Sequence, residues 1–327
     1  MISVPGFIDL QVNGYIGVDY SDDVLTEQDF IRSAKALLKQ GTAGFLPTVI
    51  TTFEEIYERN LPMLVKAMKA PELENRVLGF HLEGPFISDQ PGAVGAHNPQ
   101  AVRKPEPAFL RKLHELAEGQ IKLLTVAAEV EGVEELIACA NELGIAVSLG
   151  HHLATPEDIA KCSAAGAKLL THLGNGCPNQ IHRHNNPIWA GIADDQLIAM
   201  IITDGHHLPP TLIKTIIRAK SSKNVIITSD ASPIAGMPPG RYNTLGNVAI
   251  LETNGLLHNP EKQCLVGSSA TILECVNYLA SLNILTPEEI IEVAFSNPLR
   301  IIGVSPDSIK SDTSFAWNNE LQKFVEK

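Results

Sequence analysis

The fold is decided by residues 145–175, which read IAVSLGHHLATPEDIAKCSAAGAKLLTHLGN. Two short apolar runs, 145–149 and 167–172, flank a helical stretch that opens with Thr-Pro-Glu-Asp and stops at Gly166. Proline just inside the start and glycine just past the end are typical of an α-helix. Apolar strands separated by a helix indicate parallel pairing in a covered sheet. The segment therefore predicts one β-α-β unit.

The same alternation extends toward both ends of the chain, with glycines between the apolar runs and the helical patterns. The complete set of predicted strands is 6–12, 44–50, 77–83, 121–127, 145–149, 167–172, 197–203 and 224–229. Helices are predicted over 26–39, 133–143, 155–165, 211–219, 271–282 and 287–294. Eight such units fit an α/β fold of the (β/α)8 TIM-barrel type better than an open sheet. No Gly-x-Gly-x-x-Gly follows the first strand, which argues against a dinucleotide-binding fold.

The barrel carries a small β appendage that we expect to be incomplete. Residues 1–300 are assigned to the barrel, with a hairpin insertion at about 240–265. A strand pair with its turn at Asn318-Asn319 is predicted near the end of the chain. Residues 301–327 are therefore expected to form the C-terminal remnant of a small β domain.

The charge balance limits the classes of partner. The chain has 327 residues, with 25 Lys and Arg against 37 Asp and Glu, so its formal net charge is −12. A nucleic-acid partner is not expected, because that kind of binding depends on cationic side chains that neutralise phosphates. No apolar run is long enough to span a membrane, the first ten residues do not resemble a signal peptide, and the five cysteines contain no Cys-x-x-Cys pair. We expect a cytoplasmic protein with no membrane partner.

Polar side chains gather where the predicted strands end, which is where TIM-barrel enzymes carry their catalytic groups. Two imidazoles and one carboxylate from three of these ends make a typical ligand set for a catalytic divalent metal, with a position left for water. We predict Glu83, His151 and His172 as these ligands. A lone strand-end Glu or His is more often a loop acceptor or a satisfied core residue, so the prediction depends on the three occurring together. His152 points away from the same metal, because side chains alternate along a strand.

Asp230 ends the last predicted strand and is the remaining candidate for proton transfer. A carboxylate beside an activated water can take its proton and later protonate a leaving group. The alternative is a buried Asp that is held by backbone N–H groups.

Longer stretches carry a resemblance to a known family. They are PGFIDLQVNG (5–14), GFHLEGPF (79–86), GAHNP (95–99), GHH (150–152), THLGNGCP (171–178), DGHH (204–207), SDASPIAG (229–236) and VGSSAT (266–271). With these motifs in order, the chain resembles the N-acetylglucosamine-6-phosphate deacetylases of the amidohydrolase superfamily. The resemblance implies a metal-dependent barrel hydrolase, usually a homodimer, that removes the acetyl group from an amino-sugar phosphate.

The resemblance also implies residue roles by position. The three predicted metal ligands and the proton-transfer residue Asp230 keep the roles that are predicted above from the residues themselves. The resemblance further implies that His97 helps to polarise the acetyl carbonyl. The implied substrate-binding residues are Ala96, Asn175, Gly176, Arg183, His207, Leu265, Val266 and Gly267. His81 is expected to lie just behind the ligands. Gln11 and Asn13, also expected there, replace the His-x-His that holds a second metal in many amidohydrolases, so we expect one ion per subunit.

The chain departs from the family pattern in three places. Members normally begin with strands of a β-sandwich that precede the first barrel strand. The family's phosphate-binding arginine follows the strand-six histidine by eleven positions, and that spacing selects Arg183 within IHRHNNPIW, a different local context. His206 and Trp189 are unusual neighbours for a sugar-phosphate pocket.

These observations predict hydrolysis of the acetamide of N-acetylglucosamine 6-phosphate to glucosamine 6-phosphate and acetate. Zinc is the expected ion, with iron as the alternative. A first alternative function is deacylation of a different N-acyl sugar or amino acid. A second is a non-catalytic sugar-phosphate-binding barrel, which has no need of a base such as Asp230.

Overall fold

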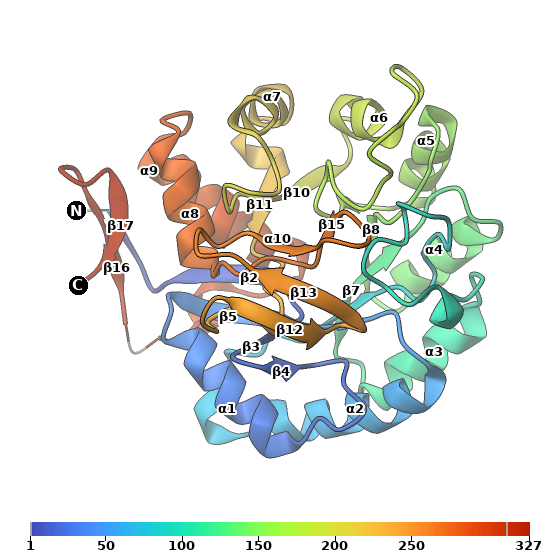
Figure 1. The fold of residues 1–327 in the computed structure, drawn as a ribbon, viewed down its shortest axis with the longest axis horizontal. Helices are drawn as coiled ribbons and strands as arrows, with labels where there is room; N and C mark the ends of the chain where they lie inside the picture. Colours follow the sequence, from blue (N-terminus) through green and yellow to red (C-terminus); the bar gives the residue numbers. More distant parts are fainter. Residues whose placement is uncertain (1, 312) are drawn as a thin grey trace.

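Eight parallel strands form the centre of the computed structural model, which describes residues 2–311 and 313–327. They are β2 (Phe7–Val12), β5 (Thr42–Ile50), β6 (Phe80–Glu83), β7 (Ile121–Val126), β8 (Ala146–Leu149), β9 (Leu169–Leu170), β10 (Ile198–Ile202) and β11 (Val225–Thr228). Each pairs with the next along the chain. Val12 and Ala231 form a parallel bridge that brings the last strand to the first. The predicted TIM-type barrel is therefore confirmed (Figure 1).

Helices surround this barrel (Figure 1). They are α1 (Glu27–Leu38), α2 (Glu54–Met68), α3 (Pro107–Leu116), α4 (Val133–Glu142), α5 (Pro156–Ala165), α6 (Pro187–Ala193), α7 (Pro210–Lys220), α8 (Ile272–Ser281), α9 (Pro287–Ile291) and α10 (Asn297–Ile301). The α5 helix begins as its sequence predicts, with a Thr155–Asp158 capping box, and it ends at Gly166 in the left-handed conformation. The α2, α3, α6 and α10 helices lie outside the predicted set. Among the described helices, none is long and apolar enough to cross a membrane.

The strand predicted over 167–172 is shorter in the structure. Only Leu169 and Leu170 pair with both neighbouring strands. The chain leaves the sheet by His172, whose φ of 26° does not fit an extended strand. This early departure carries the His172 side chain over the end of the barrel.

A four-stranded antiparallel sheet lies in front of the barrel centre in Figure 1. Its strands are β12 (Gly240–Thr244), β13 (Asn247–Leu251), β14 (Leu257–Asn259) and β15 (Cys264–Leu265). Its own small apolar cluster consists of Ile234, Ala249, Leu251, Leu257 and Val266. The hairpin material expected at about 240–265 is this sheet.

A second antiparallel sheet joins the two ends of the chain. Strand β1 (Ser3–Val4) pairs with β16 (Phe315–Asn318), which pairs with β17 (Lys323–Glu326). The predicted strand pair is thus present, and β1 is an addition that the sequence analysis does not predict. Phe324 packs edge-on against Phe7 of the barrel, with ring centroids 5.2 Å apart. This contact fixes the appendage to the first barrel strand. A short hairpin of β3 (Gly14–Tyr15) and β4 (Val18–Asp19) follows β2.

A buried carboxylate ties the two strands where the barrel closes. Asp9 of β2 accepts hydrogen bonds from the Thr228 hydroxyl (2.7 Å), the Ser229 hydroxyl (2.5 Å) and the Ser229 N–H (3.1 Å). Burial raises the pKa of Asp9, against the lowering effect of these hydrogen bonds. The same contacts hold the residue that directly precedes Asp230.

The Asp9→Ala variant is expected to lose about 3 kcal/mol of unfolding free energy, because the buried donors of Thr228 and Ser229 lose their acceptor. Urea denaturation measures this loss. The control Asp307→Ala removes an exposed carboxylate and is expected to stay within about 0.5 kcal/mol of the wild type. Equal stability of the two variants would contradict a role for Asp9 at the closure.

Candidate active site

A cavity of about 790 Å³ opens at the mouth of the barrel, near the ends of the strands. This volume suits a small-molecule ligand. Its walls include most of the predicted site residues, namely Asn13, Glu83, Ala96, His97, His151, His172, Asn175, Gly176, His207, Asp230, Leu265 and Gly267. Residues far apart in the chain therefore meet at one mouth of the barrel, as the strand-end pattern predicts.

The three predicted metal ligands converge on one point. Glu83 Oε1 lies 3.2 Å from His151 Nε2 and 3.0 Å from His172 Nε2. The two Nε2 atoms are 3.0 Å apart. Each side chain is at most 8% exposed. The structure therefore brings these three side chains together, and their role as metal ligands stays a prediction.

These separations fit a single divalent cation. Ligand bonds of about 2.1 Å, as zinc makes to imidazole and carboxylate, place neighbouring donor atoms about 3.0–3.5 Å apart. His151 Nδ1 donates to the Ala93 carbonyl at 2.9 Å, so a neutral His151 keeps its lone pair on Nε2, facing the centre. His172 presents its Nε2 to the same point. Glu83, His151 and His172 are thus the residues that fit a cation here.

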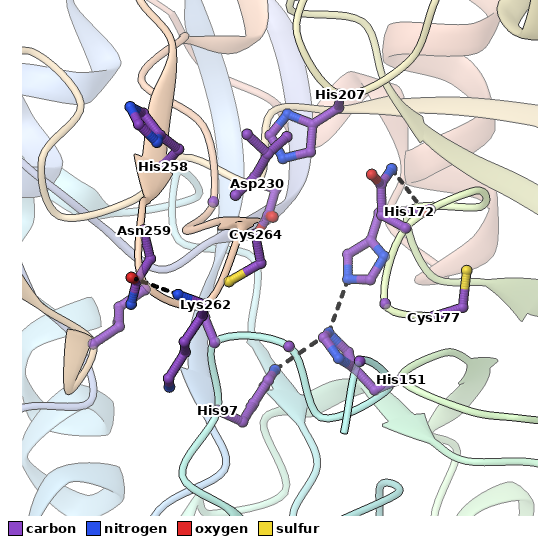
Figure 2. A pocket seen from close by; sticks show the side chains of 18 of the residues that line it. His97, His151, His172, Cys177, His207, Asp230, His258, Asn259, Lys262 and Cys264 are labelled. Atoms are coloured by element: carbon purple, nitrogen blue, oxygen red, sulfur yellow. Dashed lines mark hydrogen bonds between the residues drawn. The ribbon is translucent and has the colours of Figure 1, made fainter. Parts of the chain in front are cut away.

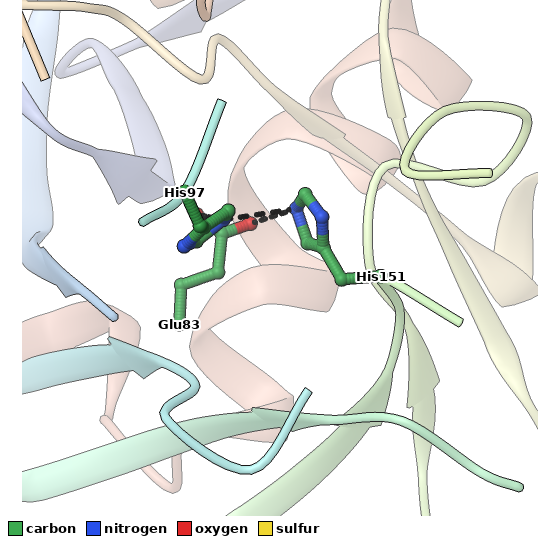
Figure 3. A group of neighbouring side chains, drawn as sticks. All are labelled: Glu83, His97 and His151. Atoms are coloured by element: carbon green, nitrogen blue, oxygen red, sulfur yellow. Dashed lines mark hydrogen bonds and ion pairs between the residues drawn. The ribbon is translucent and has the colours of Figure 1, made fainter. Parts of the chain in front are cut away.

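His97 approaches the same centre beside Glu83 and His151 (Figure 3). Its Nε2 lies 3.2 Å from His151 Nε2 and 3.6 Å from Glu83 Oε2, and these three residues form a group with ligand atoms within 4.8 Å of one another. The Thr51 N–H donates to His97 Nδ1 at 3.3 Å, and burial beside His151 lowers the pKa of His97 to about 3. The neutral ring therefore carries its proton on Nε2. His97 presents an N–H donor to the centre, which suits a carbonyl oxygen rather than a cation.

Asp230 stands on the opposite wall of the centre (Figure 2). Its Oδ1 accepts from Asn13 Nδ2 at 2.7 Å, which leaves the second carboxylate oxygen free of any such bond among the described residues. Burial, with the nearby negative charge of Glu83, raises the pKa of Asp230 to about 6. A carboxyl with this pKa is suited to exchange protons near neutral pH.

Three site residues share an unusual backbone conformation. His151, His172 and Asp230 have φ values of 50°, 26° and 51°. Positive φ is strained for residues other than glycine, and such strain gathers at functional sites. Here it turns each side chain from the end of its strand over the mouth of the barrel.

A buried polar layer supports the ligands from below. Gln11 Nε2 donates to Glu83 Oε1 at 2.7 Å, which orients that carboxylate. His81 Nε2 lies 2.8 Å from the Thr125 hydroxyl, and its Nδ1 lies 3.3 Å from the Thr48 hydroxyl. Burial lowers the pKa of His81 to about 4, so the ring is neutral. Gln11 thus contacts the ligand Glu83, and His81 lies on the same strand just beneath it, both behind the ligands as expected. Asn13 contacts Asp230 instead of a ligand.

Gly176 allows the loop after β9 to pass close to the ligands. Its φ is +63°, and a Cβ at this position would lie 3.0 Å from His172 Cε1 and 3.1 Å from the His151 nitrogen. Asn175 beside it donates its side-chain amide to the His172 carbonyl at 3.2 Å. This loop therefore presents polar backbone and an amide to the cavity without displacing the ligands.

His207 is held by a carboxylate. Its Nδ1 donates to Asp204 Oδ2 at 2.7 Å, and Asp204 Oδ1 accepts the backbone N–H groups of His206 and His207, each at 2.9 Å. Burial works to raise the pKa of Asp204, but the hydrogen bonds from His207 and the backbone lower it to about 2. The His207 Nε2 is left for the cavity.

Two of the predicted substrate-binding residues do not line the cavity. Arg183 lies on an exposed loop, where its carbonyl accepts from Trp189 Nε1 at 3.0 Å. Val266 is buried in the apolar cluster of the β12–β15 sheet, because alternation turns it away while Leu265 and Gly267 face the cavity.

The β14–β15 hairpin also brings to the cavity residues that the sequence analysis does not single out. His258, Asn259, Lys262 and Cys264 line the cavity, and Cys177 lies on the wall across from them (Figure 2). The Asn-Pro-Glu-Lys run at 259–262 carries a turn signal. Nothing in the local sequence indicates that this turn folds over the barrel mouth.

Comparison with known proteins relates the chain to one family over nearly its whole length. The family model that matches residues 2–308 describes the amidohydrolase family. The N-acetylgalactosamine-6-phosphate deacetylase of Escherichia coli O157:H7 is 31% identical over 300 residues, which are 92% of this chain and 78% of that protein. The N-acetylglucosamine-6-phosphate deacetylase of Danio rerio is 33% identical over 318 residues, which cover 93% and 76%.

Solved structures share the fold. The N-acetylglucosamine-6-phosphate deacetylase from Pasteurella multocida has a TM-score of 0.86 at 27% identity, covering 99% of this chain and 84% of that one. The enzyme of the same name from Mycobacterium smegmatis has a TM-score of 0.88 at 24% identity, covering 99% and 85%. Because these matches cover 99% of this chain, the small β sheets as well as the barrel fall within the shared fold.

Proposed function

The chain belongs to the amidohydrolase family, and we propose that it hydrolyses the acetamide of N-acetylglucosamine 6-phosphate to glucosamine 6-phosphate and acetate. The observation that carries this proposal is that the ligand atoms of Glu83, His151 and His172 lie within 3.2 Å of one another in a cavity that Asp230 also lines. The deacetylases among its relatives support the substrate class.

Glu83, His151 and His172 would hold the ion on which the family depends. When bound, a divalent cation supplies positive charge that acidifies water and polarises a carbonyl. The Asp230 carboxylate takes the proton of the attacking water. The His97 Nε2–H donates to the carbonyl oxygen as negative charge develops on it. Asp230, now protonated, gives its proton to the departing nitrogen, so one carboxyl serves both steps.

The pKa of Asp230 predicts an acid limb in the rate profile. Asp230 accepts a proton only when it is ionised, so kcat is expected to fall as the pH drops through its pKa. That pKa is about 6 when no cation offsets the negative charge of Glu83. A bound cation beside Glu83 lowers the pKa of Asp230. We expect the limb at or below pH 6, in acetate release measured from pH 4 to pH 9. A rate that rises as the pH falls below 6 would contradict Asp230 as the base.

Finer expectations belong to the same proposal. The donor set of one carboxylate and two imidazoles favours zinc, with iron as the alternative. The resemblance supports a homodimer, and we propose a cytoplasmic location. One relative is named for the galactosamine epimer, so N-acetylgalactosamine 6-phosphate is the second candidate substrate.

Acetate release from purified protein, with its metal content measured, tests the proposal. The substrates are N-acetylglucosamine 6-phosphate, its galactosamine epimer and N-acetylated amino acids. Turnover of the first at the highest kcat/KM is expected. Turnover of an acylated amino acid alone would assign a different amidohydrolase reaction, and no turnover with any substrate at full metal content would favour a binding protein.

A further inference from the structure

The proposed substrate has its two recognised groups on opposite sides of the sugar ring. The acetamide is attached to C2, and the phosphate is carried by C6 on ring atom C5, directly across the ring from C2. With the acetamide at Glu83 and His97, the phosphate must therefore lie toward another wall of the cavity. That wall needs a cation, because the chain has a formal charge of −12 and the reacting end holds the carboxylates of Glu83 and Asp230.

One wall of the cavity offers such a cation. Among the described residues that line the cavity, Lys262 is the one lysine or arginine. Its side chain is exposed and forms no ion pair with a described residue. In Figure 2, Lys262 lies with His258 and Asn259 on the hairpin side, across the cavity from His151, His172 and Cys177. An ammonium group in this place is free to contact a phosphate.

The turn that carries Lys262 has a fixed shape. Asn259 is buried, and its Oδ1 accepts the backbone N–H groups of Glu261 (2.9 Å) and Lys262 (3.1 Å). Asn259 Nδ2 donates to Asn247 Oδ1 at 3.2 Å, and Asn247 Nδ2 donates to the Ala96 carbonyl at 2.8 Å. Ala96 directly precedes His97. Two buried amides thus connect the Lys262 turn to the loop that holds the carbonyl-polarising residue.

We propose, on the basis of the function proposed above, that Lys262 binds the 6-phosphate of the substrate and that the β14–β15 turn forms the phosphate subsite. The neighbouring His258 is held by Glu252, with Nε2 3.1 Å from Oε1, so the lysine is the free cation of the pair. The subsite selects sugars with an anionic group at C6 and places the acetamide at the reacting centre.

Selectivity for phosphate tests this subsite. The Lys262→Met variant is expected to lower the ratio of kcat/KM between N-acetylglucosamine 6-phosphate and N-acetylglucosamine by about tenfold. The loss should appear mainly in KM, because the phosphate contact is the same in the ground and transition states. Lys262→Arg is expected to keep most of the selectivity. The control Lys214→Met removes a lysine of α7 that does not line the cavity, and it should match the wild type.

A binding measurement makes the result independent of turnover. Glucosamine 6-phosphate should raise the Tm of the wild type and of Lys214→Met more than glucosamine does, and this difference should shrink in Lys262→Met. An unchanged difference together with an unchanged kcat/KM ratio in Lys262→Met would overturn the subsite. Absence of acetate release in the wild type contradicts the proposed function instead, and the Tm comparison still decides the role of Lys262.

Discussion

Replacing Asp230 with asparagine is expected to lower kcat by about 10³-fold or more, while metal content stays near that of the wild type. Asparagine keeps the size of the side chain and an oxygen for the bond from Asn13 Nδ2, which is 2.7 Å long in the wild type. It has no carboxylate to take the proton of water or to return one to the leaving nitrogen. Acetate release and metal analysis on the same preparation measure both quantities.

The comparison requires a variant that changes charge but not the site. Asp307→Asn does so, because Asp307 is exposed in a short helical turn far along the chain from the barrel strands. It is expected to retain wild-type kcat. If Asp230→Asn kept kcat within tenfold of the wild type, Asp230 would be a structural carboxylate, which is the alternative that its sequence position also allows.

Replacing Glu83 with glutamine is expected to weaken metal binding by more than about 100-fold and to abolish acetate release in proportion to the metal lost. Glu83 Oε1 is the atom that both His151 Nε2 and His172 Nε2 approach, at 3.2 Å and 3.0 Å. Glutamine keeps the shape but removes the one negative charge at that point, so a divalent cation loses its strongest electrostatic partner. Metal content after dialysis against a chelator measures the change.

Removal of metal from the wild type should abolish acetate release as the glutamine substitution does. Added zinc should restore acetate release in the wild type but not in Glu83→Gln. The control Glu131→Gln changes an exposed glutamate and is expected to keep both metal and activity. Full metal retention by Glu83→Gln would show that the cation is held elsewhere.

The roles predicted from strand ends depend on a simple property of parallel barrels. Glu83 and His81 are two positions apart on β6, and Asp9 and Gln11 on β2, so alternation turns each pair into the barrel. All strands end at the same mouth, so residues at their carboxyl ends converge whatever their separation in sequence. The sequence analysis therefore finds the cluster without knowing any distance within it.

Other features of the site depend on contacts that no local pattern contains. The tautomer of His97 follows from the Thr51 N–H, 46 residues away. The place of Lys262 follows from a sheet that folds back over the mouth, fixed by an amide chain from Asn259 through Asn247 to Ala96. Arg183 shows the reverse case, since a spacing rule selects it but its exposed side chain does not line the cavity.

The sequence by itself determined the order of the eight barrel strands, the barrel class, and the set of carboxylate and imidazole groups at one mouth. These follow from periodicity and end signals, which act over a few residues and need no long-range contact. Only the tertiary structure decided which histidine nitrogen carries a proton, which glycine admits a loop beside the ligands, and which cation faces the cavity. Those properties are set by neighbours that the closed barrel and its covering sheet bring within a few ångströms, so they exist only once the chain is folded.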